Sequence, residues 1–357
     1  MSAPRRILFV LRGKLGDSIV AFASARAYAD AHPDDEVALL VRANYAPLFA
    51  AEKGLRVIGF GSRLAMFLKL AWMRWTEPGW DALVVLLGFG APVERLGRLV
   101  RAKRRIYLDG RFPDAFPEWP EIRPDHLQPE PAWRAVRMID PALAFPERST
   151  IPSLAARRVA SPRAVGLVPI SDEPRRTMGL VAIRALAAHA AQAHSGCEVR
   201  VLVNREDRWA RPLLDAGPPP GAVFRDFPAM SALVAELAEL AHLYTTDTGL
   251  YHLAAAMGVP TTVFYGPTQP WKNGFPGQPA LERARLEALG GEHCEEKGCR
   301  DPVCLDRAVG GFCGAGPDAS GPVDGTPEGC LLRRFPADRI ATVALHRAGD
   351  AAAPVPR

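Results

Sequence analysis

The chain has 357 residues, of which 48% are hydrophobic and 23% are charged, and its formal net charge is +5. This composition excludes a disordered chain, which has fewer apolar residues and a higher net charge. The 44 lysines and arginines against 39 aspartates and glutamates suit anionic ligands or a membrane surface. No motif typical of nucleic-acid binding accompanies this excess, so we expect no nucleic-acid partner.

The length predicts two domains, because one hydrophobic core rarely serves a chain of this size. In the first part, residues 1–160, short β-branched or Leu-rich runs alternate with helix-length segments. This alternation is typical of a parallel sheet with helices on both faces. We predict strands over residues 7–11, 37–41, 56–59, 83–87 and 105–108, and helices over 17–31, 45–53, 64–75 and 93–100.

The segment 110–162 is rich in proline and shows little periodicity, which indicates an interdomain stretch or an irregular insertion. The alternation then resumes and predicts a second doubly wound domain over residues 161–335, followed by a C-terminal helix and tail over 336–357. We predict strands over 165–168, 199–203, 223–227, 243–246 and 261–265, and helices over 178–193, 206–214, 230–241, 249–257 and 337–346.

No segment has the length and apolarity of a transmembrane helix. The longest nearly uncharged stretch, residues 82–93, contains Gly88, Gly90 and Pro92 and is shorter than the roughly 20 apolar residues that span a bilayer. The N-terminus has no apolar run or cleavage site of a secretory signal, so we expect a cytoplasmic protein.

In open parallel sheets, ligands bind outside the carboxyl ends of the strands, and the first such loop here is rich in polar chemistry. Arg12 and Lys14 suit a phosphate or an acceptor, and Gly16 allows close backbone approach. Asp17 follows where the helix is predicted to begin. Asp17 is either a reactive carboxylate or the N-cap of that helix, and these two roles are not exclusive.

A second loop with the same placement contains Asp247, Thr248 and Gly249 at the start of a helix that is predicted to end at Gly258. The free amides of such a helix start form an anion site, and His252 in the first turn can reach the same anion. In the alternative interpretation, Asp247 and Thr248 only cap the helix and His252 packs in the core.

Together, residues 6–17 and 246–267 resemble glycosyltransferase family 9, the family of the ADP-heptose:lipopolysaccharide heptosyltransferases. The string from Asp247 to Gly249, followed after two residues by His252, Leu253, Ala254 and Ala255, is the strongest element of this resemblance. Gly16 and Asp17, preceded by Leu15, add a shorter one. The resemblance implies an α/β protein of the GT-B fold, in which two Rossmann-like domains with doubly wound parallel sheets face each other across a cleft.

The resemblance also implies an activity and its partners. The expected enzyme is an inverting glycosyltransferase that moves a heptose or a related sugar from a nucleotide-diphosphate donor, ADP-heptose, to a lipopolysaccharide-core or similar glycan or glycolipid. Domain 1–160 would bind the acceptor, and domain 161–335 the nucleotide sugar. A glycolipid acceptor would bring the enzyme into peripheral contact with the inner face of the cytoplasmic membrane.

Individual roles follow from the same resemblance. Asp17 matches the proposed general base that takes the proton of the acceptor hydroxyl. Arg175 or Arg176 would contact the donor phosphates, and Glu206 would hold the donor ribose. The remaining donor-binding residues would be Asp247, Thr248, Gly249 and His252, and the acceptor or phosphate contacts would be Arg12, Lys14 and Gly16.

Two observations bear on metals. No Asp-any residue-Asp triplet is present, so the metal-dependent route of many sugar transferases lacks its ligands, and no cofactor is expected in catalysis. Thiolates at high density can hold a structural zinc or iron, but the paired spacing typical of structural zinc is missing and a local structural trait is the alternative. The candidate ligands are Cys294, Cys299, Cys304 and Cys313.

Two other functions stay open at this point: a nucleotide-sugar epimerase of the same fold, and a non-catalytic module that binds nucleotide sugars. Two surface features are also ambiguous. The predicted helix over 64–75 mixes Trp and Leu with cations, so it either packs in the core or lies against a membrane. The basic run over 95–105 is either a solvated surface or a grip for acceptor phosphates.

Overall fold

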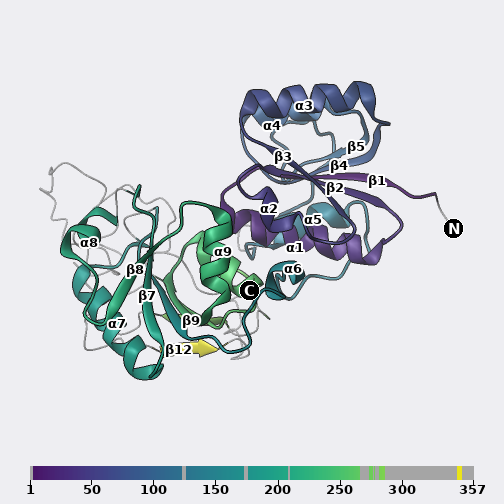
Figure 1. Ribbon diagram of the computed structural model, residues 1–357. Coiled ribbons are helices and arrows are strands. Elements are labelled where there is room, and N and C mark those ends of the chain that lie inside the picture. The colour runs from purple at the N-terminus through teal and green to yellow at the C-terminus, as the bar shows by residue number, and fades with distance from the viewer. Residues whose placement is uncertain are drawn as a thin grey trace, which may run out of the picture. The chain divides into compact units, whose positions relative to one another are not determined.

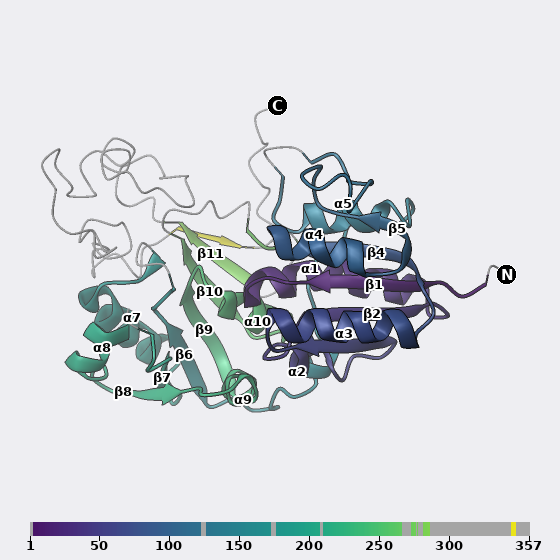
Figure 2. The same ribbon diagram turned by 90° about the horizontal axis from the view of Figure 1, so that it is seen from above.

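A computed structural model describes residues 3–122, 126–172, 176–207, 210–265, 273–275 and 277, and the backbone of 281–285 and 344–347. The chain divides into two compact units, Met1–Ala156 and Arg157–Arg357, here called the N-terminal and C-terminal units. Each unit consists of one largely parallel sheet with helices (Figures 1 and 2). The α/β architecture with two parallel sheets is therefore confirmed.

The N-terminal unit is built on five parallel strands in the order β3-β2-β1-β4-β5. Five of the six residues of β1 are buried, because helices cover both faces of the sheet and leave no solvated side. The strands are β1 (Arg6–Leu11), β2 (Glu36–Arg42), β3 (Leu55–Phe60), β4 (Trp80–Leu87) and β5 (Ala102–Ile106).

The helices of this unit form two layers. Figure 1 shows α3 and α4 on one face of the sheet and α1 and α5 on the other. Met66 and Leu70 of α3 and Leu96 of α4 join the core that they share with Leu8 and Val10 of β1. The helices are α1 (Leu15–Ala31), α2 (Ala46–Phe49), α3 (Arg63–Thr76), α4 (Ala91–Leu99), α5 (Glu130–Arg137) and α6 (Pro152–Ala155).

Some predicted bounds in this unit are wrong. Helix α1 begins at Leu15 and has Lys14 as its N-cap, so Asp17 is not the cap. The predicted helix over 45–53 is only the short α2, and the segment 110–162 contains the helix α5, which the prolines concealed. Proline is tolerated in the first turn of a helix, and Pro131 occupies that position in α5.

The C-terminal unit contains a seven-stranded sheet in the order β12-β11-β10-β9-β6-β7-β8. Its pairs are parallel except β11 with β12, which are antiparallel. The strands are β6 (Ala164–Val168), β7 (Glu198–Val203), β8 (Ala222–Asp226), β9 (Leu240–Thr246), β10 (Thr261–Tyr265), β11 (Leu281–Arg285) and β12 (Ala344–Arg347).

Successive residues of β10 show that helices cover both faces of this sheet, since neighbouring side chains point to opposite sides. Phe264 joins the core formed with α7, whereas Val263 and Tyr265 pack with Tyr251 of α10. The helices are α7 (Leu180–Ala193), α8 (Arg211–Ala216), α9 (Met230–Ala238) and α10 (Gly249–Ala256).

The predicted end of α10 is confirmed, because Gly258 follows the helix with φ +76°, a left-handed conformation that favours glycine. Two other predictions differ from the structure. The helix predicted over 206–214 begins only at Arg211, and the helix predicted over 337–346 is wrong for residues 344–346, which belong to β12. Pairing with β11, which is distant in sequence, overrides the local helical pattern there.

In the described part of the chain, no helix combines the length and the apolar character that crossing a membrane requires.

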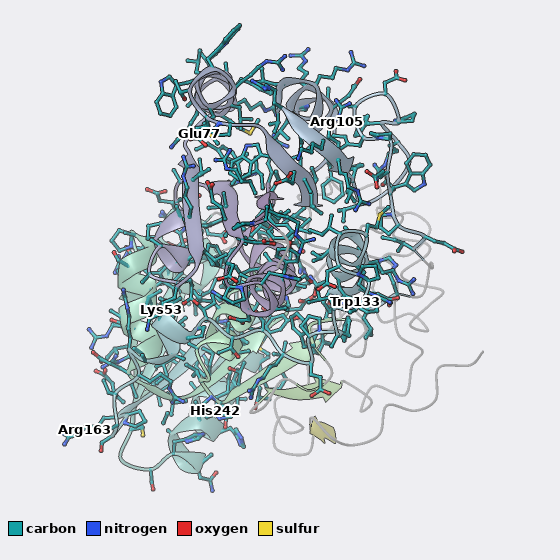
Figure 3. The ribbon with its side chains drawn as sticks, turned by 90° about the vertical axis from the view of Figure 1, so that its right-hand side faces the viewer. Lys53, Glu77, Arg105, Trp133, Arg163 and His242 are labelled. Carbon is teal, nitrogen blue, oxygen red and sulfur yellow. The ribbon has the colours of Figure 1, made fainter. Side chains whose placement is uncertain are left out.

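Three histidines and a tyrosine gather on one face of the C-terminal sheet. His242 of β9 (labelled in Figure 3) stacks on Tyr244, with ring centroids 4.4 Å apart, and lies 5.2 Å from the ring of His194. The Nε2 atom of His242 is 2.8 Å from Oγ1 of Thr262. Burial, together with the neighbouring His194 and His189, lowers the pKa of His242 to about 4.

Acid is therefore expected to destabilise the C-terminal unit. As the pH falls, the unfolded chain protonates His242 at its ordinary pKa of about 6.5, before the folded state does. Between a pH of about 6.5 and a pH of about 4, the free energy of unfolding therefore falls by up to about 1.4 kcal/mol per pH unit. Urea unfolding at about pH 7 and about pH 5 measures this loss. His242→Gln should reduce this loss of stability. If the variant lost as much stability in acid as the wild type, His242 would not be its cause.

Candidate functional site

The carboxyl ends of the strands mark one place in each unit where ligands bind in sheets of this type. In the N-terminal unit, β1 lies between β2 and β4. The strands β2 and β3 are added on one side of β1 and β4 and β5 on the other, so the strand order reverses direction at β1. In the C-terminal unit, β6 lies between β7 and β9 in the same way. Crevices form at such topological switch points, and the loops after β1, β4, β6 and β9 border them.

The loop after β1 is held closely against the end of β4. The Arg12 main-chain N–H donates to the Leu87 carbonyl oxygen over 2.7 Å. A Cβ atom on Gly13 would lie 2.1 Å from Cδ2 of Leu87, so only glycine fits without a shift of this leucine. The loop then enters α1 at Lys14, which is exposed, while Gly16 is buried in the first turn.

Gly13→Ala is expected to destabilise the N-terminal unit by about 1–3 kcal/mol, the usual cost of overpacking a tight site. Gly61→Ala is the matched control, because no atom lies within 4 Å of a Cβ placed there. Urea unfolding of both variants checks the prediction. Equal stability of the two would show that Leu87 moves aside without cost.

Asp17 is the third residue of α1, and its side chain is half-buried at this edge of the sheet. Its Oδ1 accepts a hydrogen bond from Nε2 of Gln128 over 3.1 Å. Gln128 lies just ahead of α5 in the proline-rich segment, where no periodicity pointed to it. The carboxylate is thus oriented by a residue that is distant in sequence, and its position in the first turn suits the positive end of the helix dipole.

Cations gather near the same loop. Nη1 of Arg12 donates to the Phe89 carbonyl oxygen over 3.3 Å, and burial lowers the pKa of Arg12. Repulsion from Arg63 and Arg42 lowers this pKa further. Arg42 ends β2 and Arg63 begins α3, so three elements bring these charges together. A bound anion would relieve the repulsion between these arginines. Of the three, the sequence motif indicated only Arg12 as a candidate phosphate contact.

In the C-terminal unit, the loops after β6 and β9 are joined by an ion pair. Nη1 of Arg176 donates to the main-chain oxygen of Asp247 over 2.8 Å and to its Oδ2 over 3.2 Å. The two side chains are only 16% and 6% exposed. Nη2 of Arg176 also contacts the exposed Asp172 at 3.3 Å. A buried charge pair of this kind fixes the guanidinium at the switch point of the sheet.

The loop that carries Arg176 is itself closed by local hydrogen bonds. Oγ1 of the buried Thr177 accepts from the Ser171 N–H over 3.1 Å, and the Met178 N–H donates to the Pro169 carbonyl oxygen over 2.9 Å. Arg175, the other arginine expected to contact the donor, lies outside the described residues.

The start of α10 matches the predicted capped helix. Oγ1 of Thr248 accepts from the Leu250 N–H over 3.2 Å, so the capping role of Thr248 is confirmed, and Gly249 is the first helical residue. Asp247 does not share the cap in the contacts described. Its Oδ2 instead accepts from Nδ2 of Asn273 over 3.4 Å, a partner that lies beyond β10 and that no sequence signal indicated.

His252 and Glu206 differ in their surroundings. His252 is 8% exposed and stacks on Tyr251, with ring centroids 3.7 Å apart. This packing agrees with the alternative interpretation of His252 and leaves its anion contact as a prediction. Glu206 is exposed in the loop after β7, and its main-chain N–H donates to Oδ1 of Asn204 over 3.0 Å. The described contacts therefore bring Arg176, Asp247 and Asn273 together, and none of them joins Glu206 to this group.

The cysteines proposed as metal ligands, Cys294, Cys299, Cys304 and Cys313, lie outside the described residues. Within the described ranges, no group of three or more His, Cys, Asp or Glu side chains is arranged to hold a metal ion. The question of a structural metal therefore rests on the cysteines themselves.

Comparison with known proteins gives one matching family and several similar folds. The sequence model of glycosyltransferase family 9 (heptosyltransferase) matches residues 228–303. A family 9 glycosyltransferase from Veillonella parvula is 14% identical with a TM-score of 0.67, and the match covers 81% of this chain and 88% of that one. The chain resembles glycosyltransferase family 9. No curated protein sequence matches.

Two other solved structures, both of bacterial sugar transferases, are similar. The E. coli heptosyltransferase WaaC, solved with ADP, is 18% identical with a TM-score of 0.62, over 78% of this chain and 93% of that one. The iron-containing dodecameric glycosyltransferase TibC from enterotoxigenic E. coli is 15% identical with a TM-score of 0.51, over 79% of this chain and 62% of that one. The fold is thus that of the GT-B heptosyltransferases.

The family 9 match has a definite extent. It includes Asp247, Thr248, Gly249 and His252, whereas Asp17, Arg176 and Glu206 precede it. The family match therefore includes the loop at the start of α10, and the roles expected for all of these residues stay predictions.

Proposed function

We propose that this chain is an inverting glycosyltransferase that transfers a heptose or a related sugar from ADP-heptose, or a similar nucleotide-diphosphate sugar, to a lipopolysaccharide-core or similar glycan acceptor. The observation that carries the proposal is the buried Arg176–Asp247 pair beside the N-terminus of α10. It provides a fixed cation beside the Thr248 and Gly249 amides at the switch point of the sheet, which suits a diphosphate.

The C-terminal unit, as the donor domain, would bind the nucleotide sugar. A departing nucleotide diphosphate gains negative charge in the transition state, so groups that are fixed in advance stabilise that state more than the ground state. Arg176 and the amides of Thr248 and Gly249 supply such groups, with Arg175 and His252 as further contacts. Glu206, exposed after β7, is placed at the same edge and would accept hydrogen bonds from the ribose hydroxyls.

The N-terminal unit, as the acceptor domain, would supply the base. Asp17 accepts the proton of the acceptor hydroxyl as that oxygen bonds to the anomeric carbon. The bond from this carbon to the diphosphate oxygen breaks, and the nucleotide diphosphate leaves with the electron pair. Attack from the face opposite the leaving group inverts the anomeric configuration. Arg12 with Arg42 and Arg63, together with Lys14 and the backbone at Gly16, would bind phosphates of the acceptor.

The proposal needs no metal in the transfer step, because Arg176 and the helix amides take the place of a cation on the diphosphate. A structural metal at the C-terminal cysteines is a separate matter, and the similar protein TibC is described as iron-containing. The enzyme would act in the cytoplasm, where nucleotide sugars are made, with a glycolipid acceptor at the inner face of the membrane.

The test is to incubate the purified chain with ADP-heptose and a heptose-deficient core acceptor in the presence of EDTA. The proposal expects ADP release and a glycosylated acceptor whose new linkage is of opposite anomeric configuration to the donor, as determined by NMR. Formation of an epimeric nucleotide sugar from the donor in the absence of acceptor would identify an epimerase instead. Donor binding with neither ADP release nor product would identify a binding module.

A further inference from the structure

Helix α3 presents an apolar stripe to solvent, opposite the face that packs in the core. Its buried side chains are Met66, Leu70 and Met73. The exposed apolar side chains are Leu64, Leu68, Trp72 and Trp75, which are 68%, 63%, 60% and 85% exposed. Their spacing of four, four and three residues places them on one side of the helix. An exposed apolar row of this kind is typical of a surface that binds a partner.

The charges of α3 are all positive and flank this stripe. No aspartate or glutamate occurs between residues 63 and 76, whereas Arg63, Lys69 and Arg74 do. At 100° per residue, Lys69 lies on one border between the exposed and buried faces, and Arg63 and Arg74 lie on the other. Nη1 of Arg74 donates to the Leu99 carbonyl oxygen over 2.8 Å, which holds this cation beside the end of α4.

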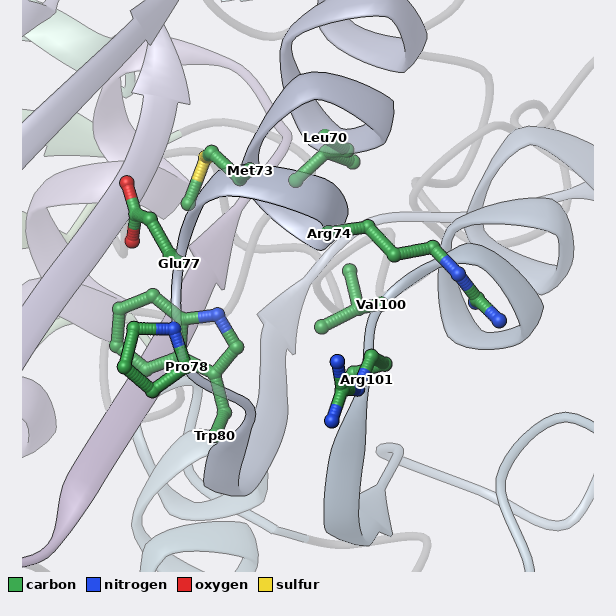
Figure 4. A pocket seen from close by; sticks show the side chains of 8 residues that line it. All are labelled: Leu70, Met73, Arg74, Glu77, Pro78, Trp80, Val100 and Arg101. Carbon is green, nitrogen blue, oxygen red and sulfur yellow. The ribbon is translucent and has the colours of Figure 1, made fainter.

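Further cations lie beside α3 on the same face of the sheet. Helix α4 lies on the same face as α3 (Figure 1), and its Arg95 and Arg98 are exposed. Arg74 and Arg101 line a pocket at the end of α3, whose apolar lining includes Met73 and Val100 (Figure 4). The acidic residue of this pocket, Glu77, is neutralised by ion pairs with Arg56 and Arg6.

The rest of the basic run over 95–105 is used inside the unit. Lys103 pairs with Asp81 at 2.6 Å, Arg104 pairs with Glu118, and Nη1 of Arg105 donates to the Gly97 carbonyl oxygen over 3.3 Å. Arg98 pairs with Glu94 of α4 at 2.7 Å. Arg95 and Arg101 are the exposed cations of this run for which no carboxylate partner is described, and they lie on and next to α4. The α3–α4 face is therefore both apolar and cationic.

We propose that the α3–α4 face binds the surface of an anionic phospholipid bilayer. Leucine and tryptophan side chains enter the boundary between headgroups and acyl chains, while lysine and arginine at the borders contact lipid phosphates. A protein partner of matching shape would need carboxylates arranged around an apolar groove, whereas an anionic bilayer offers both features at every point. The inference is argued from this face alone and does not depend on the transfer reaction.

The experiment is co-sedimentation of the full chain with vesicles, without donor or acceptor. Binding is expected to vesicles of phosphatidylcholine mixed with phosphatidylglycerol, to weaken with salt, and to be much weaker with phosphatidylcholine alone. Trp72→Ser with Trp75→Ser should lower the apparent affinity at least about tenfold, because both apolar anchors are lost. Trp119→Ser, which alters an exposed tryptophan of the same unit outside α3, is the matched control.

Lys69→Gln with Arg95→Gln is the second variant and should lower both the affinity and its salt dependence. All these side chains are exposed, so thermal unfolding should match that of the wild type. Absence of vesicle binding by the wild type would overturn the proposal, as would equal binding by the two double variants. A concentration-dependent dimer that the Trp72 and Trp75 changes abolish, without vesicle binding, would instead assign this face to a second copy of the chain.

Discussion

Replacing Asp17 by Asn is expected to reduce turnover by about 10²–10⁴-fold, the usual contribution of a positioned general base. The amide keeps the size of the side chain but cannot take the proton of the acceptor hydroxyl. Donor affinity should be unchanged, because Asp17 belongs to the N-terminal unit and the proposed donor contacts to the C-terminal unit. Initial rates of ADP release, with calorimetric titration of ADP, separate the two effects.

Two variants control for damage to α1 and to the carboxylate's surroundings. Asp30→Asn makes the same change on the same helix, where Asp30 only pairs with Arg26 on the surface, and should retain full turnover. Gln128→Ala removes the hydrogen bond to Asp17 and should have an intermediate effect. If Asp17→Asn turned over as fast as the wild type, Asp17 would have no part in proton transfer.

Asp247→Ala is expected to lower the free energy of unfolding of the C-terminal unit by about 3–5 kcal/mol, because it leaves the Arg176 guanidinium buried without its main counter-charge. The variant should also bind ADP more weakly, since Arg176 is no longer held in place. Urea unfolding and calorimetric titration with ADP measure the two effects.

Arg176 provides its own matched control. It contacts Asp172 at 3.3 Å and Asp247 at 3.2 Å, but the first carboxylate is 56% exposed and the second only 6%. Asp172→Ala should therefore cost about 0–1 kcal/mol, as exposed ion pairs do. Arg176→Met combined with Asp247→Ala should be more stable than the sum of the single changes predicts. Equal costs for the two aspartates would mean that burial does not strengthen the pair.

Elements with strong local signals could be predicted from the sequence. The run from Ile7 to Leu11 is β-branched or apolar throughout and forms most of β1, because a strand covered on both faces needs no polar alternation. Helix α10 was predicted over 249–257 and is observed over Gly249–Ala256, since Thr248 and Gly258 mark its ends. The sequence motif around Asp247 predicted a loop at the start of a helix, and the structure has one there.

Elements without a local signal could not be predicted. Nothing in the side chain of Lys14 marks it as an N-cap, so the sequence pattern predicts the start of α1 at Asp17, two residues too late. Prolines concealed α5, although one of them occupies a tolerated first-turn position. Strand β12 depends on pairing with β11, which the local pattern of residues 337–346 does not reveal.

The partners of the candidate site are also non-local. Gln128 reaches Asp17, and Asn273 reaches Asp247, from segments where the sequence shows no motif. The repulsion of Arg12 by Arg42 and Arg63 arises because three separate elements end or begin at one place. Such contacts depend on strand order, which periodicity does not determine.

The order of the strands in the C-terminal sheet governs when the proposed donor site can form during synthesis. Strand β6 is made first but lies between β7 and β9, so one of its edges stays open until β7, β8 and the intervening helices have left the ribosome. Asp247, which fixes Arg176, follows only after β9. A nascent chain that stops before β9 has a bare strand edge and lacks Asp247 of the proposed donor site, and edges of this kind invite aggregation. Nucleotide binding would thus report that a newly made C-terminal unit has completed its central sheet.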